Sequence, residues 1–285
     1  MVAKIIDGRA IAAEIRKQVA EEARLLWDQY GVQPGLAAIL VGNDPASEVY
    51  VGLKQKACEE VTFAFRKISL PSGVSEEDVI EHIQKLNNDD RIHGVIVQLP
   101  LPPHLNENKI ISALSPEKDV DGLHPLNMGR LLIGDEGITP CTPTGIITLL
   151  EKEGISLRGK HVVIVNRSKI VGRPLMVMMI NRDATVTVCH SKTVNLEKHT
   201  RAADILIVAV GKPKFISEDM VKDGAIVVDV GINRVEGRIV GDVDFERVKE
   251  KAAAITPVPG GVGPMTVAML LKNVLKAAKN SVKRG

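Results

Sequence analysis

The stretch that decides the fold reads Gly159-Lys160-His161-Val162-Val163-Ile164-Val165-Asn166-Arg167-Ser168-Lys169-Ile170-Val171-Gly172-Arg173-Pro174. Val162–Val165 is a continuous β-branched run, which is typical of a parallel strand buried on both faces. The apolar segment after Pro174 predicts a helix, since proline suits a first helical turn. Backbone amides near residues 172–174 are therefore expected to face an anion such as a nucleotide phosphate.

The usual dinucleotide fingerprint is missing from this loop, because Gly172 is the only glycine between the strand and the helix. An ordinary strand-to-helix turn therefore stays open as an alternative. A nucleotide site needs support from other parts of the chain.

Composition narrows the class of protein. The 285 residues are 45% apolar, which favours two domains over one. A net charge of +2 without long basic runs argues against nucleic acid or a membrane surface as the main partner. The histidines have no metal-ligand spacing, so no metal site is expected.

Cysteine usage and the N-terminal residues bear on location. Cys58, Cys141 and Cys189 are widely spaced and form no CxxC pair, which favours reduced thiols in a cytoplasm. Residues 1–15 carry four charges and so lack the core of a signal peptide, and no apolar run is long enough to span a membrane. We expect a cytoplasmic protein.

Strands and helices alternate in two sets. The expected strands are 36–41, 63–70, 94–99, 161–165, 185–189, 205–210 and 225–230, and the expected helices include 11–27, 45–60, 75–86 and 265–278. Alternation implies right-handed parallel crossovers. The prediction is an α/β fold of two domains with a cleft between them, the second a Rossmann-like parallel-sheet nucleotide-binding domain.

The turn-rich region 100–143 is interpreted as the crossing between the domains. We expect a first, catalytic domain of residues 1–120 plus 265–285, whose C-terminal helix packs back on it. Residues 121–264 are expected to form the nucleotide-binding domain.

One lysine stands out as a candidate for chemistry. Tyr50 and Lys54 share a helix face, whereas Lys56 points away from them. Gln98 ends a strand of the same predicted sheet and could hold the lysine. A lysine in a partly apolar site loses its charge more easily and can act as a base or acid. The alternative is a solvated lysine covered by a tyrosine ring.

Two further groups are candidates for ligand binding. Asp121 could accept paired hydrogen bonds from the NH groups of a heterocycle, whereas Asp119 is expected to be a turn residue. After the strand 185–189 an NAD site usually has a carboxylate on the ribose. Here the residues are Cys189-His190-Ser191-Lys192, so NADP is preferred over NAD.

Six ordered motifs closely resemble the bifunctional methylenetetrahydrofolate dehydrogenase/methenyltetrahydrofolate cyclohydrolase family. They are Tyr50-Val51-Gly52-Leu53-Lys54, Val97-Gln98-Leu99-Pro100-Leu101-Pro102, Lys118-Asp119-Val120-Asp121-Gly122, Arg167 to Pro174, Cys189-His190-Ser191-Lys192-Thr193 and Pro257-Val258-Pro259-Gly260-Gly261-Val262-Gly263-Pro264-Met265-Thr266. The resemblance implies NADP-dependent oxidation of 5,10-methylenetetrahydrofolate and hydrolysis of the methenyl product to 10-formyltetrahydrofolate.

The resemblance also implies roles for residues. Lys54, Tyr50, Gln98 and Asp121 would be catalytic, and the substrate would also contact Leu99, Pro259, Gly260, Gly261, Val262 and Gly263. NADP would contact Asn166, Arg167, Ser168, Ser191 and, through its backbone, Ile232. A homodimer, a role in purine biosynthesis and a folate substrate with or without a polyglutamate tail are implied as well.

The chain departs from the family pattern at two places. Asn166 stands where a glycine is usual, and Val61-Thr62 stands where a Gly-Ile pair is expected. The open alternatives are a monofunctional or NAD-preferring member, a non-catalytic NADP- or folate-binding regulator, and a shikimate-type dehydrogenase.

Overall fold

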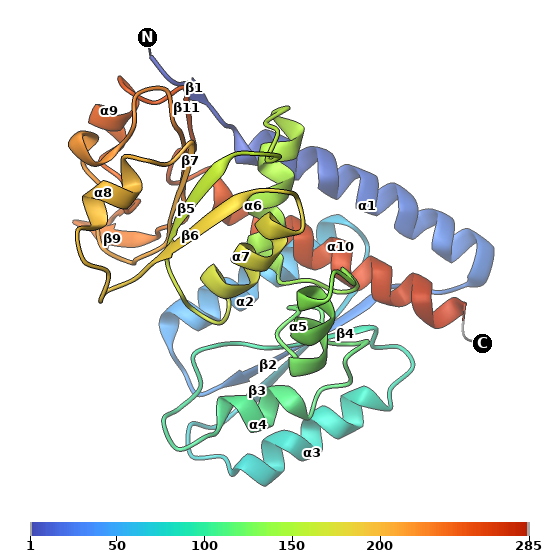
Figure 1. The fold of residues 1–285 in the computed structure, drawn as a ribbon. Helices are drawn as coiled ribbons and strands as arrows, with labels where there is room; N and C mark the ends of the chain where they lie inside the picture. Colours follow the sequence, from blue (N-terminus) through green and yellow to red (C-terminus); the bar gives the residue numbers. More distant parts are fainter. Residues whose placement is uncertain (1, 284–285) are drawn as a thin grey trace. The chain divides into compact units, whose positions relative to one another are not determined.

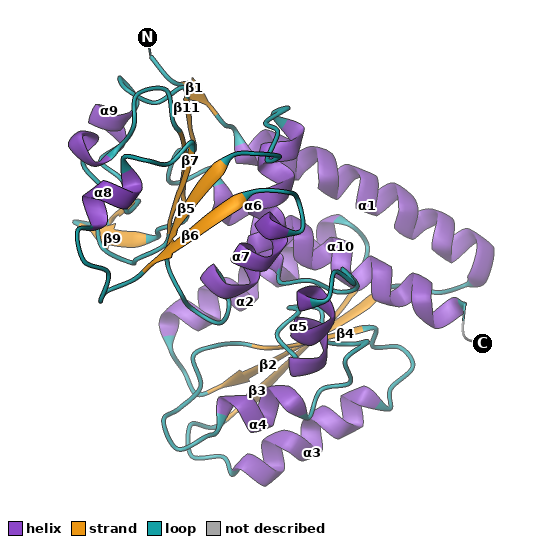
Figure 2. Cartoon of the chain, in the orientation of Figure 1, coloured by secondary structure: helices purple, strands orange, loops and turns teal. Residues whose placement is uncertain are grey.

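The chain divides into two compact units in the computed structural model, which describes residues 2–283 (Figures 1 and 2). The nucleotide unit contains Thr142–Thr266 and the start of the chain up to Ala12. The Lys54 unit contains Ala13–Cys141 and the chain from Val267 onward. Each unit has its own parallel sheet, so the predicted pair of α/β domains is confirmed.

The described part of the nucleotide unit contains a six-stranded parallel sheet. Its order is β1 (Lys4–Ile5), β11 (Ala254–Ile255), β8 (Ile226–Asp229), β7 (Ile205–Val208), β5 (His161–Val165) and β6 (Thr185–Cys189). A short hairpin, β9 (Asn233–Val235) and β10 (Arg238–Val240), follows β8. Because β5 lies between β6 and β7, the strand order reverses there, and ligands of such sheets bind at that point beyond the carboxyl ends.

Burial explains the composition of these strands. Residues 162–165 of β5 are all buried, as expected for a strand covered on both faces. Side chains of η1 (Glu218–Met220) and α9 (Phe245–Val248) belong to the core on one face, and Leu196 of α8 (Leu196–Thr200) packs against it. The helix α7 (Gly172–Ile180) contacts β5 and β6, and α6 (Cys141–Lys152) comes before β5 in the chain.

The Lys54 unit is built on a three-stranded parallel sheet within the described residues. Its order is β3 (Ala64–Leu70), β2 (Gly35–Val41) and β4 (Gly94–Val97). Its helices are α2 (Pro45–Glu60), α3 (Glu76–Asn87), α4 (Glu107–Ser112), α5 (Pro125–Leu132), most of α1 (Gly8–Tyr30) and most of α10 (Val262–Val282). Side chains of α3 and α4 pack on one sheet face, and α2 lies on the other (Figure 1). The two crossovers run in opposite directions, which places their helices on opposite faces.

The unit boundaries differ from the predicted ones. Residues 121–141 belong to the Lys54 unit, because Asp119 bridges Val95 beside β4 and α10 binds the segment that follows. The first residues belong to the nucleotide unit, because β1 pairs with β11. The region 100–143 is therefore mostly part of one unit, with two helices, rather than a crossing.

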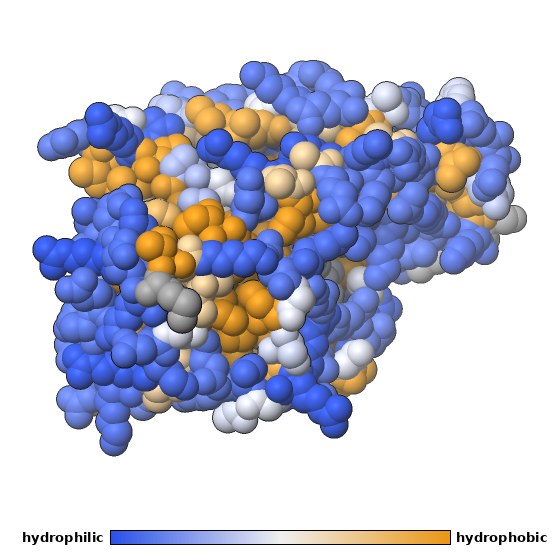
Figure 3. Space-filling model, turned by 90° about the horizontal axis from the view of Figure 1, so that it is seen from above, coloured by the Kyte–Doolittle hydropathy of each residue, from blue (hydrophilic) through white to orange (hydrophobic). Residues whose placement is uncertain are grey.

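Across residues 2–283 we find no helix with the length and apolar content that a membrane span requires. Hydrophilic residues dominate the face drawn in Figure 3, and hydrophobic residues show there as patches.

Candidate active site

Lys54 is placed by the helix α2. The carboxylate of Asp44 accepts the backbone N–H of Ser47 at 2.8 Å and caps the helix, and Pro45 opens its first turn. Lys54 is half-buried, and Tyr50, one turn earlier, is 42% exposed. Tyr50 and Lys54 are therefore carried by a helix whose first turn is capped and begins shortly after β2.

Gln98 meets the lysine from the neighbouring strand. Its backbone N–H continues the ladder beyond β4 by donating to the carbonyl of Ile39 at 2.9 Å. The Nζ of Lys54 donates to Gln98 Oε1 at 3.1 Å, and Gln98 Nε2 donates to the carbonyl of Leu99 at 2.7 Å. Because the amide nitrogen is used by Leu99, the oxygen is directed at the lysine. The structure thus brings together the two side chains that we expected to meet.

Asp121 lies in a segment that runs beside β4, the strand that Gln98 follows. The parallel bridge between Val95 and Asp119 places the segment 119–121 beside the end of β4. Complete burial raises the pKa of the Cys141 thiol well above its usual value, the charge and hydrogen bond of Asp121 add to this rise, and the charge of Lys54 opposes it. One buried thiol is therefore under the influence of both Asp121 and Lys54.

The turn that carries Asp121 is held by two residues outside the predicted site. Asp119, 1% exposed, accepts N–H groups from Leu123, His124 and the side chain of Asn127, at 2.8–3.2 Å. Burial raises the pKa of Asp119 to about 6 despite these bonds. Asp119 is thus a turn residue, as predicted.

The sequence reasoning missed the second of these residues, Asn273 of α10. Its Nδ2 donates to the carbonyls of Val120 and Thr139 at 2.9 and 3.0 Å. The only signal in the sequence is a polar residue on the otherwise apolar face of a helix, which does not reveal its partners.

The proposed 2′-phosphate residues follow neighbouring strands. Val165 of β5 pairs with Cys189 of β6, so Arg167 and Ser191 both lie two residues beyond that pair. Both residues are exposed. Lys192 comes next, and no carboxylate occurs among residues 189–192. The site has hydroxyl and cationic groups that fit a phosphorylated ribose, and it has no acid that would repel one.

The loop after β5 corrects one prediction. Asn166 Oδ1 accepts the backbone N–H groups of Ser168 at 2.7 Å and Gly172 at 2.9 Å, and the N–H of Arg173 donates to the carbonyl of Ser168 at 3.1 Å. Pro174 has no N–H. The expectation that amides of residues 172–174 face an anion is therefore wrong, because the loop itself uses them.

The other proposed contacts lie in two segments of the nucleotide unit. Ile232 is 49% exposed, and a carbon added at Gly263 would lie 3.9 Å from its Cδ1. Pro259 and Gly263 are exposed, whereas Gly260 and Gly261 are buried. Val262 begins α10, three residues earlier than predicted. The glycine-rich stretch is thus half loop and half helix start.

Two buried carboxylates in this unit, Asp229 and Asp242, were also missed. They are 3% and 0% exposed, and both accept backbone N–H groups of loops at the carboxyl ends of the strands. Burial raises the pKa of Asp229 to about 6. Acidic residues beside a hairpin look like surface residues in a sequence, so nothing in the sequence set them apart.

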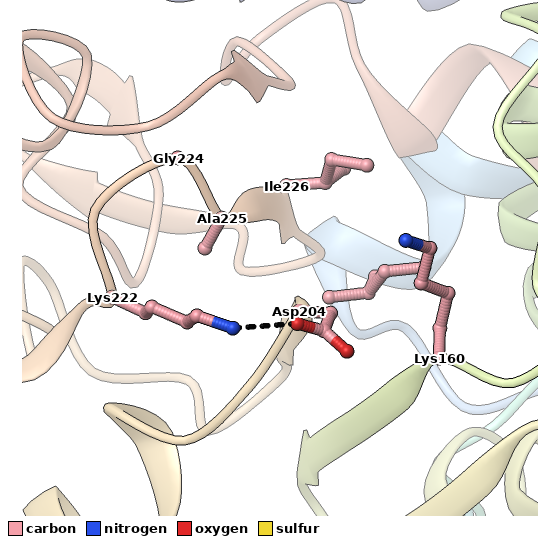
Figure 4. A pocket seen from close by; sticks show the side chains of 7 residues that line it. Lys160, Asp204, Lys222, Gly224, Ala225 and Ile226 are labelled. Carbon is pink, nitrogen blue, oxygen red and sulfur yellow. Dashed lines mark hydrogen bonds and ion pairs between the residues drawn. The ribbon is translucent and has the colours of Figure 1, made fainter.

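A small pocket lies at the opposite, amino edge of the same sheet (Figure 4). Lys222 Nζ and Asp204 Oδ1 are 2.6 Å apart in it, and Lys160 lies nearby. Asp204 also accepts the backbone N–H of His161 at 3.0 Å, which joins the starts of β5 and β7. Because Asp204 and Lys222 form an ion pair with each other, we assign this pocket a structural role.

Comparison with known proteins decides the family. Residues 6–121 match the tetrahydrofolate dehydrogenase/cyclohydrolase catalytic domain, and residues 140–282 match the NAD(P)-binding domain of the same enzymes. The chain belongs to the tetrahydrofolate dehydrogenase/cyclohydrolase family. It is 53% identical over 279 residues to the bifunctional protein FolD of Halalkalibacterium halodurans, covering 98% of this chain and 100% of the relative.

Solved structures of the tetrahydrofolate dehydrogenase/cyclohydrolase family agree over the whole chain. The bifunctional FolD enzyme of Campylobacter jejuni superposes with a TM-score of 0.96 at 49% identity, covering 98% of this chain and 99% of that one. The Trypanosoma brucei enzyme, solved with NADP and an inhibitor, gives 0.95 at 42% identity, covering 99% of both chains. The predicted bifunctional enzyme with NADP as its cofactor is confirmed.

Shikimate dehydrogenases share only the fold. The structure from Aquifex aeolicus gives a TM-score of 0.55 at 10% identity. The shikimate-type alternative is therefore replaced by the tetrahydrofolate dehydrogenase/cyclohydrolase assignment.

Proposed function

We propose that Lys54 manages the protons of the cyclohydrolase reaction. The observation that carries this proposal is the 3.1 Å hydrogen bond from Lys54 Nζ to Gln98 Oε1. Water adds to the bridging carbon of the methenyl cation, and Nζ in its neutral amine form takes a proton from that water. The same Nζ returns this proton to the ring nitrogen as the bond between that nitrogen and the carbon breaks, and the hydroxyl group of the adduct loses its proton to solvent as it becomes the formyl oxygen. Overall, one water is consumed and one proton is released.

The neighbouring residues would orient the folate. Tyr50 is exposed one turn from Lys54 and offers a ring face to the aromatic part of the substrate. The Asp121 carboxylate can accept two hydrogen bonds from the edge of the pterin. Leu99 follows Gln98 and offers apolar contact, and we assign residues 259–263 to substrate binding as well.

In the dehydrogenase reaction, bound NADP accepts a hydride from the bridging methylene carbon. The resulting cation is shared by two nitrogens, so the protein has mainly to align the two reactants. Arg167, Ser168 and Ser191 would hold the phosphate groups with charged and hydroxyl donors. Ile232 would contact the cofactor through its backbone. Asn166, whose side chain is used inside the loop, would act by shaping that loop.

The experiment that tests the lysine compares two variants of the same helix. Lys54→Met should reduce methenyltetrahydrofolate hydrolysis at least about 100-fold, the lower end of the range for one positioned acid or base. The variant should fold like the wild type, and its Kd for NADP should stay within about twofold, because neither property depends on this amine. Lys56→Met, exposed on another face of α2, is the matched control and should hydrolyse normally. Full hydrolysis by the Lys54 variant would remove Lys54 from this role.

One two-cofactor assay measures both activities of the purified chain. Purified chain is mixed with 5,10-methylenetetrahydrofolate and either NADP or NAD, and the methenyl absorbance is followed. Turnover that is faster with NADP supports the proposal, and turnover only with NAD supports an NAD-preferring enzyme. No turnover by folded chain would support a non-catalytic regulator. Accumulation of methenyl product without hydrolysis would indicate a monofunctional enzyme.

We further infer a cytoplasmic homodimer that acts on folates with glutamate tails and supplies 10-formyl groups for purine biosynthesis. The buried, unpaired Cys58, Cys141 and Cys189 support a reducing compartment. The strand β6 is at an edge of the six-stranded sheet, and such an edge can pair with a second copy. Light scattering of the purified chain tests the dimer, and a monomer across the micromolar range would contradict it.

A further inference from the structure

Asp242 joins two loops at the carboxyl edge of the six-stranded sheet. Its Oδ2 accepts the backbone N–H groups of Val210 and Gly211, and its Oδ1 accepts that of Lys212 at 2.9 Å. Its Oδ1 also accepts Asn233 Nδ2 at 2.8 Å. The first three donors follow β7 and the fourth follows β8, so one buried carboxylate holds both loops.

Asp229 gives this junction a second layer. Its Oδ1 accepts the N–H groups of Gly231 at 2.9 Å and Asp242 at 3.0 Å, and its Oδ2 accepts that of Val243 at 2.9 Å. The packing is tight, since a carbon added at Gly231 would lie 2.4 Å from Asp242 Oδ1. The backbone just before Ile232 is thus pressed against the Asp242 carboxylate.

The loops held by Asp242 lie on the side of β5 away from the 2′-phosphate residues. Arg167 and Ser191 follow β5 and β6, whereas residues 210–212 and 230–233 follow β7 and β8 on the other side of β5. A dinucleotide bound across the switch point with its phosphorylated ribose at β6 extends toward β7 and β8. Its nicotinamide end then meets the loops that Asp242 holds.

We propose that Asp242 is a positioning residue for the nicotinamide end of the cofactor. This inference rests on the NADP site proposed above. A carboxylate suits the position because it only accepts hydrogen bonds and four N–H donors point at it. An asparagine of the same shape would turn an NH2 group toward some of those donors and release one of the loops.

The test compares Asp242→Asn with a matched control, Asp204→Asn. Asp204 accepts a backbone N–H in the same unit but at the amino edge of the sheet. The probes are NADP and 2′,5′-ADP, a fragment that carries the phosphorylated ribose without nicotinamide. We expect Asp242→Asn to raise the Kd of NADP about tenfold or more, which corresponds to the loss of one or two hydrogen bonds. The Kd of 2′,5′-ADP should stay within about twofold of the wild-type value. Hydrolysis of added methenyltetrahydrofolate should not change.

Each other outcome counts against the inference. Equal weakening of NADP and 2′,5′-ADP by Asp242→Asn would show general damage to the unit and overturn the positioning role. Unchanged NADP affinity in that variant would overturn it as well, and so would an equal loss in Asp204→Asn. If the wild-type chain bound neither 2′,5′-ADP nor NADP, the NADP site itself would be refuted. That result differs from a loss of binding that is seen only in the variant.

Discussion

The side-chain amide of Asn166 makes three hydrogen bonds to the residues around it. Its Nδ2 donates to the carbonyl of Ala209, and its Oδ1 accepts the N–H groups of Ser168 and Gly172. A glycine at this position could make none of these bonds. The departure from the family pattern therefore adds a connection between the loops after β5 and β7. Gly172 cannot carry a side chain for a separate reason, because an added carbon would lie 2.2 Å from the backbone carbonyl oxygen of residue 166, which is present whatever the side chain there.

The second departure from the family pattern is a matter of backbone conformation. Thr62 has φ +61°, in the left-handed region where glycine is the usual residue. Its neighbour Val61 is buried at the end of α2. Neither residue lies in the proposed site, so this change concerns the turn alone.

Arg167 gives the residue-scale prediction for cofactor choice. Arg167→Ala should raise the Kd of NADP by about 10- to 100-fold, because a charge-assisted hydrogen bond to phosphate contributes about 1.5–3 kcal/mol. The Kd of NAD, which lacks that phosphate, should change less than about threefold. Calorimetric titration of both cofactors measures this, with Lys160→Ala at the amino edge as the control. Equal weakening of both cofactors would refute the phosphate assignment.

At the scale of elements, α10 does more than cover the sheet. It begins within the glycine-rich stretch, and farther along it presents Asn273 to the segment that carries Asp121. Periodicity predicted this helix over 265–278, but periodicity describes only which face is buried. The partners of a polar residue on that face depend on which segment packs there.

Asn273→Leu should destabilise the chain and disturb folate binding. The buried carbonyls of Val120 and Thr139 would each lose the hydrogen bond from Asn273, which costs about 1–3 kcal/mol in the free energy of unfolding. The KM for methylenetetrahydrofolate should rise while the Kd of NADP stays constant. Urea unfolding and steady-state kinetics measure the two effects. Lys272→Ala, exposed on the same helix, should stay within about 0.5 kcal/mol of wild type. A weaker NADP Kd with normal folate kinetics would contradict the placement of this contact.

The loop between β5 and α7 shows why a helix start is an incomplete predictor of a phosphate site. A proline in the first turn was rightly interpreted as a helix signal, and α7 begins at Gly172. Whether the first amides are available depends on nearby acceptors, and here Asn166 and Ser168 use them. The N–H groups of Gly172 and Arg173 are therefore not available to a phosphate in this structure.

For the whole molecule, two buried aspartates make stability depend on pH. The pKa values of Asp119 and Asp229 are both raised to about 6, one in each unit, mainly by burial. The folded chain thus holds these protons more tightly than the unfolded chain, whose value is about 3.8. Their contribution to the free energy of unfolding is complete below pH 3.8 and is lost as pH rises through about 6.

Asp119→Asn tests this dependence. Relative to the variant, the free energy of unfolding of the wild type should fall by about 1–3 kcal/mol as pH rises from about 4.5 to about 7.5, since one pKa unit equals about 1.4 kcal/mol. Urea unfolding at both pH values measures it, and Asp223→Asn, on the surface, is the control. A difference that is the same at both pH values would contradict the raised pKa of Asp119.

The sequence alone determined the alternating elements, the two domains and the pairing of Lys54 with Gln98, since strand and helix periodicities and caps act over a few residues. The shared edge of parallel strands then brings the ends of the central strands together. Only the tertiary structure decided that Asn273 binds Val120, that β1 joins β11, and that Asp242 unites two loops. The contact of Asn273 with Val120 joins residues 153 positions apart, and the pairing of Lys4 with Ala254 joins residues still farther apart in the chain. The energy of these contacts comes from satisfying buried polar groups whose partners are set by packing.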